Sequence, residues 1–404
     1  MINPATLDPM PRFEPFSALR YSTSDSTDIT PLTSAPYDVF DEDQRAKYAE
    51  TDPHNIVLLD YPIDADGPSR YQLSADRLNE WRTNGHIVSD DSATFSIYRM
   101  TFTDEAGTTR TTVGVIGALE VVDEGAGGVL PHERTTPKAK TDRLDLTIAT
   151  HANLSPVWGL SLTSGLTAAL TETGELVAQC TDEEGVHHVL ERVSDPARIA
   201  TISRLVSENP VLIADGHHRY AISRTFRDQS RTAGKPIGAE LTMTYVAELV
   251  QEQLSVAAIH RLYDIDNATL LSVLTTHYDT SDAGRVGTHT ISEMDSRGSL
   301  CLVSPDGTGT FLTPRADTFA GVRDMDSARL EHALRNTEHN VTYQHGVTEV
   351  VSKLAAGVAA SAILIRPVSL AEIRRTADTG ELMPPKSTFF TPKLRTGMVM
   401  RDLN

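Results

Sequence analysis

The sequence has little cysteine, no long apolar run and a deficit of positive charge. Cys180 and Cys301 are the only cysteines among 404 residues. This excludes a disulfide framework and favours a cytoplasmic location. The longest apolar stretch, residues 355–365, is broken by Gly357 and Ser361, so it is shorter than the roughly 20 residues that a membrane helix needs. Residues 1–16 hold four prolines and no hydrophobic segment, which argues against a signal peptide.

The charge balance is strongly acidic. Thirty-six Lys and Arg face fifty-five Asp and Glu, which gives a net charge of −19. Nucleic-acid phosphates demand Lys and Arg, so general nucleic-acid binding is not expected. Apolar residues make up 39% and charged residues 23%, which indicates a soluble globular protein of one large domain or two to three ordinary ones.

Strand-like and helix-like segments alternate irregularly, and several strands adjoin as hairpins, which is typical of an α+β (mixed α/β) fold. The predicted strands are residues 56–60, 95–103, 111–122, 211–214, 241–248 and 299–303. The predicted helices are residues 75–84, 141–152, 220–227, 329–334 and 348–360. We expect a motif-bearing core over residues 1–285 and a C-terminal α+β region over residues 286–404, since Gly, Ser, Thr and Asp cluster near this boundary.

The sharpest local signal is the sequence that follows the predicted strand 211–214. Asp215, Gly216, His217, His218 and Arg219 form a polar turn, and a helix begins within a few residues. A helix start presents unpaired N–H groups to an anion, and glycine lets the backbone approach a phosphate closely. Arginine can bind phosphate oxygens bidentately. Asp215 could cap the helix, hold magnesium or accept a proton from a hydroxyl; alternatively it is only an N-cap, and the histidines are ordinary surface residues.

A second cluster of polar residues lies between residues 132 and 153. Glu133 is a potential general base, but Glu133 and Arg134 could equally form a solvated pair of little energetic value. Asp142 could be a helix cap or an exposed first-turn charge. The density of charged groups favours a loop that contacts a ligand. Its candidate residues are His132, Glu133, Arg134, Thr135, Lys138, Arg143 and Asn153.

Two flanking clusters complete the candidate site. Near the N-terminus, Tyr37 and Asp38 follow a proline that fixes a turn. Near the C-terminus, Lys386, Ser387 and Thr388 have the chemistry of a phosphate loop, but no G-x-x-x-x-G precedes them, so this is not a Walker A motif. The alternative is an edge strand with basic ends. The further candidate in this region is Lys393.

Taken together, these motifs resemble the bacterial and archaeal family known as domain of unknown function 1015. The resemblance runs from about Tyr21 to Gly397. The motifs that carry it are P-Y-D-V at 36–39, H-E-R-T at 132–135, the D-x-R region at 142–143, D-G-H-H-R-Y at 215–220 and P-x-K-S-T-x-F at 384–390. Because the family is named for its unknown function, membership implies no activity.

The segment D-G-H-H-R-Y is also similar to the phosphate-binding turn of the ParB/sulfiredoxin superfamily. There, a strand–G-x-H-R–helix element holds nucleotide phosphates. The similarity implies a ParB/sulfiredoxin-like nucleotide-binding core, around residues 200–250, elaborated by additional strands and helices. That superfamily includes kinases that phosphorylate free serine with ATP or ADP, magnesium and a carboxylate base.

The resemblance favours a nucleotide-dependent kinase with free L-serine as acceptor, in a chain that could form a homodimer. Donor phosphates would contact Gly216, His217, His218, Arg219, Arg134, Lys386, Ser387 and Thr388. The catalytic side chains would be Glu133, Asp215 and His218; of the two carboxylates, one would act as base and the other would hold Mg2+. The acceptor would contact Tyr37, Asp38, His132, Thr135, Lys138, Arg143, Asn153 and Lys393. The alternatives are a nucleotide-binding regulator without turnover, a ParB-like nuclease or DNA-binding protein, and a nucleotide-independent hydrolase.

Overall fold

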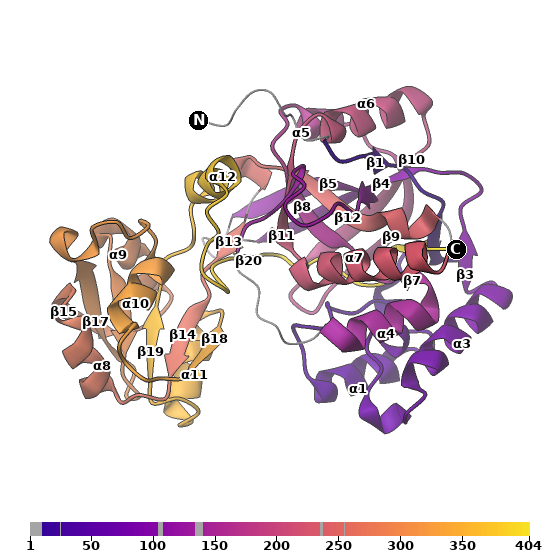
Figure 1. The fold of residues 1–404 in the computed structure, drawn as a ribbon. Coiled ribbons are helices and arrows are strands. Elements are labelled where there is room, and N and C mark those ends of the chain that lie inside the picture. Colours follow the sequence, from indigo (N-terminus) through magenta and orange to yellow (C-terminus); the bar gives the residue numbers. More distant parts are fainter. Residues whose placement is uncertain (1–9, 25, 104–107, 134–139, 235–236, 254) are drawn as a thin grey trace. The chain divides into compact units, whose positions relative to one another are not determined.

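The computed structural model describes residues 10–24, 26–103, 108–133, 140–234, 237–253 and 255–404 (Figure 1). By packing, the chain divides into two units. The first unit is Met1–Leu254 together with Pro392–Asn404, and the second unit is Ser255–Thr391. The boundary expected at residue 285 falls at the end of strand β15 (Tyr278–Arg285), inside the second unit.

A large mixed sheet forms the centre of the first unit. In spatial order its main strands are β6 (Val129–Pro131), β11 (Val211–Asp215), β8 (Val157–Ser161), β12 (Leu241–Glu248), β5 (Thr109–Glu120), β4 (Phe95–Thr103), β10 (His187–Val193) and β9 (Glu175–Thr181), and β1 (Phe13–Glu14) pairs with β5. Strand β11 runs parallel to β6 and antiparallel to β8. Residues 95–103 and 241–248 are strands as predicted, and the mixed α+β class is confirmed.

Helices pack around this sheet (Figure 1). Helices α5 (Leu166–Ala169) and α6 (Pro196–Ser207) pack on each other and bury Leu166, Ile202 and Val206 against the strands. Three further helices pack in succession: α7 (His217–Thr232) on α4 (Lys140–Thr150), and α4 on α3 (Arg70–Thr83). Helices α1 (Glu42–Thr51) and α2 (Val57–Asp60) also belong to this unit.

The prediction of a strand at residues 56–60 is wrong, because Val57–Asp60 forms the short helix α2. A short buried apolar run does not by itself distinguish a strand from a buried helical turn. The preceding residue decides here. The Asn55 side chain accepts a hydrogen bond from Val57 N at 3.0 Å and donates to the carbonyl of Pro31 at 2.8 Å. It therefore starts a helical turn and fixes this turn to the 3-10 helix Thr30–Leu32.

The C-terminal residues complete the first unit. Strand β21 (Met400–Asp402) lies between β2 (Ala18–Tyr21) and β7 (Ala152–Asn153) in a small sheet that also contains β3 (Ile87–Ser89). Residues 392–404 therefore return to the first unit after the chain has formed the second.

The second unit has its own sheet with helices on both faces. The strands, in spatial order, are β15, β17 (Thr308–Pro314), β16 (Leu300–Val303), β19 (Ser361–Leu364), β14 (His260–Tyr263) and β18 (Val341–Gln344). One apolar cluster includes side chains of α8 (Asn267–Leu274) and α10 (Asp326–Leu334), and a second includes α9 (His289–Arg297) and α11 (Val347–Ala355). This unit also contains α12 (Leu370–Thr379) and the strand pair β13 (Val256–Ala257) and β20 (Phe389–Phe390). Among the described residues, no helix has the length and apolarity to cross a membrane.

Candidate functional site

The strand–turn–helix predicted around Asp215 is confirmed. Strand β11 ends at Asp215, Gly216 adopts a left-handed conformation with φ 81°, and α7 begins at His217. A β-carbon on Gly216 would lie 2.9 Å from Nε of Arg219. The positive φ favours glycine here, and a β-carbon would also displace the Arg219 guanidinium.

The Asp215 carboxylate faces two cations rather than capping the helix, whose N-cap residue is Gly216. Its Oδ2 lies 3.1 Å from Nη2 of Arg219 and 3.6 Å from Nζ of Lys393. Arg219 also donates to the carbonyl of Pro156. Burial lowers the pKa of Arg219, but Asp215, Asp38 and neighbouring groups outweigh this and raise it, so the guanidinium stays charged. The turn thus combines a carboxylate, two cations and a helix N-terminus.

A second arginine lies nearby and is already paired. Arg143 is 7% exposed, and its Nη1 lies 3.0 Å from Oδ1 of Asp60, which is 3% exposed. The Tyr37 ring covers the Arg143 guanidinium at 3.6 Å. Burial raises the pKa of Asp60, while Arg143 and Arg219 oppose that shift. The sequence reasoning missed Asp60, whose only signal was an acidic residue at the end of an apolar run.

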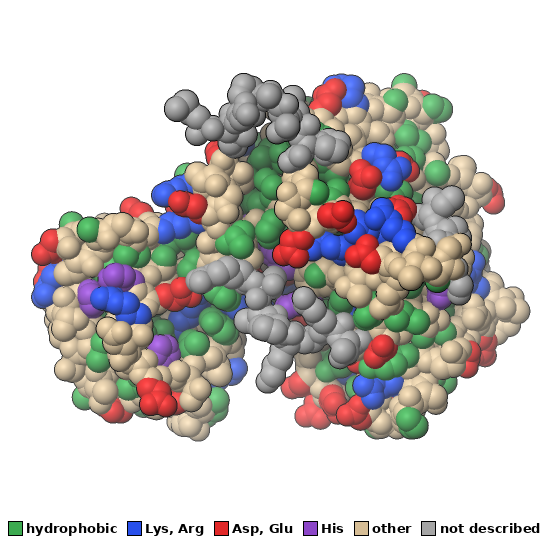
Figure 2. Space-filling view, in the orientation of Figure 1, with side chains coloured by type: hydrophobic (Ala, Val, Ile, Leu, Met, Phe, Trp, Pro, Cys, Tyr) green, Lys and Arg blue, Asp and Glu red, His purple; other side chains and the backbone are tan. Residues whose placement is uncertain are grey.

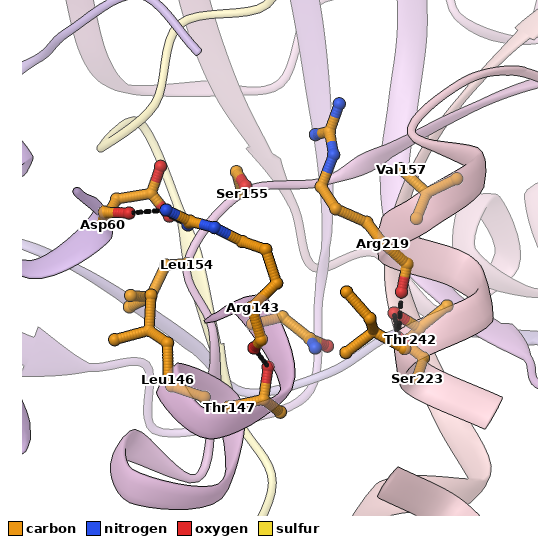
Figure 3. Close-up of a pocket in the computed structure, with 13 residues that line it drawn as sticks. Asp60, Arg143, Leu146, Thr147, Leu154, Ser155, Val157, Arg219, Ser223 and Thr242 are labelled. Carbon is orange, nitrogen blue, oxygen red and sulfur yellow. Dashed lines mark hydrogen bonds and ion pairs between the residues drawn. The ribbon is translucent and has the colours of Figure 1, made fainter. Parts of the chain in front are cut away.

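A small cavity of about 40 Å3 separates the two arginines. Figure 3 shows Arg143 turned toward Asp60, and Arg219 extended away on the other side of Ser155. Helix α4 contributes Thr147 to the wall, and the remaining lining residues include Asn153, Ser223 and Thr242. Nucleotide-sized ligands need several hundred Å3. The cavity therefore has room for a carboxylate or hydroxymethyl group, and not for a nucleotide.

His132 lies behind the turn as a neutral, buried ring. Its Nδ1 donates to the carbonyl of Ile213 at 2.6 Å, and its ring centroid lies 4.8 Å from that of His217. Nε2 lies 3.8 Å from Oε2 of Glu133. Burial lowers the pKa of His132 to about 4, although the Ile213 carbonyl and Asp215 act in the opposite direction. The ring therefore supports β11 and the first turn of α7 in its uncharged form.

We expect stability to fall as the pH drops from about 6.5 to about 4, because the unfolded chain takes up a proton on His132 that the folded state excludes. The full effect amounts to about 3 kcal/mol in the free energy of unfolding. Urea unfolding of the wild type and His132→Gln at pH 7 and 4.5 measures it; the glutamine amide can still donate to Ile213. His187→Gln, on an exposed ring of β10, is the control. An unchanged pH dependence in His132→Gln would contradict the expectation.

The other candidate residues differ in how the structure places them. Asp38 is exposed, near enough to Arg219 to affect its pKa, and His218 is half-buried in the first turn of α7. The Asn153 side chain accepts a hydrogen bond from Met243 N at 2.9 Å. Outside the described residues lie Arg134, Thr135 and Lys138.

The segment Lys386–Thr388 belongs to the second unit. Lys386 is exposed and has a positive φ of 55°. Ser387 is buried, and its hydroxyl donates to the carbonyl of Pro384 at 2.7 Å and lies 3.1 Å from that of Ser327. Thr388 is buried as well. Within the second unit, Ser387 therefore stabilises the turn that precedes β20.

A family model described as a protein of unknown function (DUF1015) matches residues 13–334. The chain belongs to this family. The resemblance inferred from the motifs is thereby confirmed. The matched range contains the turn at Asp215 and ends before Lys386 and Lys393.

No curated protein matches this DUF1015 chain. Similar solved structures include a conserved hypothetical protein from Pyrococcus furiosus, 12% identical, covering 65% of this chain and 87% of that chain, with a TM-score of 0.36. A free serine kinase in complex with AMP is 13% identical; the match covers 65% of this chain and 83% of that chain, with a TM-score of 0.36. SbnI from Staphylococcus aureus, truncated at its C-terminus, is 11% identical; the match covers 69% of this chain and 84% of that chain, with a TM-score of 0.36.

Four of the DUF1015 motif segments meet in the first unit. Tyr37 covers Arg143, Asp38 and Asp215 both act on Arg219, and His132 donates to the strand that ends at Asp215. Lys393, from the C-terminal residues, joins them. Segments far apart in the sequence therefore form one charged cluster around the start of α7.

Proposed function

We propose that this DUF1015 chain is a nucleotide-dependent kinase that transfers a phosphoryl group to the hydroxyl of a small metabolite. The observation that carries the proposal is Asp215, which lies between Arg219 and Lys393 at the N-terminus of α7. Phosphoryl transfer asks a protein mainly for positioning, charge neutralisation and a group that orients or deprotonates the acceptor. The cluster contains side chains for each of these tasks.

The helix start is suited to the donor phosphates of ATP or ADP. The first N–H groups of α7 and its dipole favour an anion, and the Arg219 guanidinium lies beside Gly216 at the same helix start. Arg219 and Lys393 would neutralise charge on the transferred group. Asp215 or Glu133 would accept the acceptor's proton, and the other would hold Mg2+, which prefers carboxylate oxygens. Magnesium held there would offset the charge of the donor phosphates.

The cavity between Arg143 and Arg219 supports a small acceptor. Its volume, about 40 Å3, accommodates a group of a few heavy atoms. Arg143 uses its two terminal nitrogens for Asp60, so the acceptor would be held by the Arg143 Nε–H and by the Ser155 and Asn153 side chains. Free L-serine is the favoured acceptor, since it combines a hydroxymethyl group with a carboxylate and since the turn resembles that of free serine kinases.

The charges on the outer side of α7 disfavour a nuclease or DNA-binding function. Basic and acidic side chains lie together in this region (Figure 2). Arg224 pairs with Glu124 at 2.9 Å, and Arg231 pairs with Glu240 at 2.5 Å. Arginines already paired with carboxylates do not offer the unpaired basic surface that phosphate backbones require.

Phosphorus NMR tests the proposal. The full chain is incubated with magnesium, with ATP or ADP, and with serine alone or within a pool of hydroxylated metabolites. We expect a new phosphomonoester signal that needs both donor and acceptor. Absence of product with every pair would overturn the kinase; a nucleotide that still raised the melting temperature would then indicate a regulatory module, and salt-sensitive DNA binding would indicate a ParB-like function.

A further inference from the structure

Residues 392–404, here called the return segment, are fixed in the first unit by polar contacts. Arg395 is almost fully buried, and its Nη1 pairs with Oε2 of Glu183 at 2.7 Å. Thr396 N donates to the Ser34 carbonyl at 2.9 Å, and Ser34 N donates back to Thr396 at 3.2 Å. Lys393, which faces Asp215, lies two residues before Arg395. The return segment is thus anchored two residues after Lys393, the residue that it places at the candidate site.

The backbone of Arg395 is held by a buried chain of hydrogen bonds whose direction can be derived. The Asp182 carboxylate can only accept, so Nε2 of His188, 3.1 Å away, must carry the proton. Burial lowers the pKa of His188, although the Asp182 hydrogen bond opposes this, so the ring is neutral and its Nδ1 is an acceptor. Tyr98 Oη therefore donates to Nδ1 at 2.9 Å and accepts from Arg395 N at 3.0 Å.

The chain of hydrogen bonds from Asp182 through His188 and Tyr98 to the Arg395 amide is here called the relay. Loss of one bond in the relay leaves the neighbouring polar group without its partner. Tyr98 is 1% exposed and His188 is 0% exposed. Water cannot replace a lost partner at that depth without rearrangement, and a buried polar group left unpaired is costly. The relay therefore fixes the Arg395 amide more rigidly than an exposed hydrogen bond would.

The anchor also reaches the other side of the candidate site. Ser34, which pairs with Thr396, directly precedes the segment that carries Tyr37 and Asp38. The Thr396–Ser34 pair therefore positions two segments: the segment that brings Lys393 to Asp215 and the segment that brings Tyr37 to Arg143.

We propose that Tyr98, His188 and Asp182 are positioning residues, which act through the Arg395 backbone to hold Lys393 beside Asp215. The inference rests on the proposed function for its catalytic consequence. The relay touches no substrate, and its role is to keep the ammonium group of Lys393 where a transferred phosphoryl group would meet it. Positioning of this kind affects rate steeply with small displacements.

The test compares Tyr98→Phe with Tyr245→Phe in the full chain. Both tyrosines are buried, but Tyr245 Oη has no hydrogen-bond partner in the described part of the chain. Removing the Tyr98 hydroxyl should raise hydrogen exchange at the Arg395 amide about tenfold. It should also raise the rate at which acetic anhydride modifies Lys393 about threefold, as the ammonium group leaves Asp215. Tyr245→Phe should change neither rate by more than about twofold.

Asp182 provides a second pair of variants. Asp182 accepts from His188 Nε2–H through Oδ2 and from Glu184 N and Val186 N through Oδ1. The single amide oxygen of Asp182→Asn cannot serve both sides, so Asp182→Asn and Asp182→Ala should both raise the two rates as Tyr98→Phe does. In a phosphoryl-transfer assay, Tyr98→Phe should lower kcat by about tenfold, while the KM for the acceptor changes by less than about threefold. Nitrogen-15 NMR of the His188 ring should show the proton on Nε2.

The outcomes separate the two proposals. Equal exchange at Arg395 in Tyr98→Phe and Tyr245→Phe, or a His188 proton on Nδ1, would overturn the relay. Faster exchange with unchanged modification of Lys393 would overturn its positioning role. If the wild type lacks turnover with every donor and acceptor, the proposed function fails, while exchange and Lys393 modification still decide whether the relay positions that residue.

Discussion

Arg219→Lys is expected to lower kcat/KM for phosphoryl transfer by at least about 100-fold, which is the usual effect of removing one donor that stabilises transition-state charge. The Arg219 guanidinium contacts Asp215 at 3.1 Å and the Pro156 carbonyl, and its planar fork leaves further N–H groups for phosphate oxygens. A lysine keeps the charge but has a single ammonium group, so it cannot serve all three partners. Steady-state rates followed by phosphorus NMR measure the change.

Arg224→Lys, five residues further along α7, is the matched control. Its partner Glu124 is 91% exposed, so the pair lies in water and should contribute little. We expect kcat/KM to stay within about twofold of wild type. If Arg219→Lys retained comparable activity, the bidentate role assigned to Arg219 would be contradicted. Melting temperatures of both variants show whether any loss reflects unfolding.

The turn at Asp215 could be predicted because its signals are local. An apolar strand, a glycine and a helix start follow one another within a few residues, and each has a distinct backbone preference. The structure places Gly216 at φ 81° at the junction. Tyr37, Asp38 and Lys393 were also candidates, but only as members of a resembling motif or a basic segment, with nothing in the sequence to place them next to Arg143 or Asp215.

The partners of these residues could not be predicted, because they are set by packing between distant segments. Asp60 pairs with Arg143 across 83 positions, and it lies in a run that the pattern assigned to a strand. Tyr98 reaches Arg395 across 297 positions. Periodicity identifies which faces are apolar, but it does not tell which buried polar groups satisfy one another.

Arg143→Ala is expected to cost about 3–5 kcal/mol in the free energy of unfolding, the usual loss when one member of a buried ion pair is removed. Asp60 would be left with an uncompensated charge in a site that is 3% exposed. Burial already raises the pKa of Asp60, and loss of Arg143 would raise it further. Because a carboxyl with a raised pKa destabilises the folded state only when ionised, the loss should shrink as the pH falls through that pKa.

Tryptophan fluorescence during urea unfolding measures this loss, since both tryptophans of the chain, Trp81 and Trp158, lie in the first unit. The control is Arg82→Ala, which removes a guanidinium that is 36% exposed and lies 2.8 Å from Asp402; this change should cost less than about 1 kcal/mol. Adding Asp60→Asn to Arg143→Ala should recover part of the stability, because the amide leaves no buried charge. Equal losses in the two arginine variants would contradict the cost assigned to the buried Arg143–Asp60 pair.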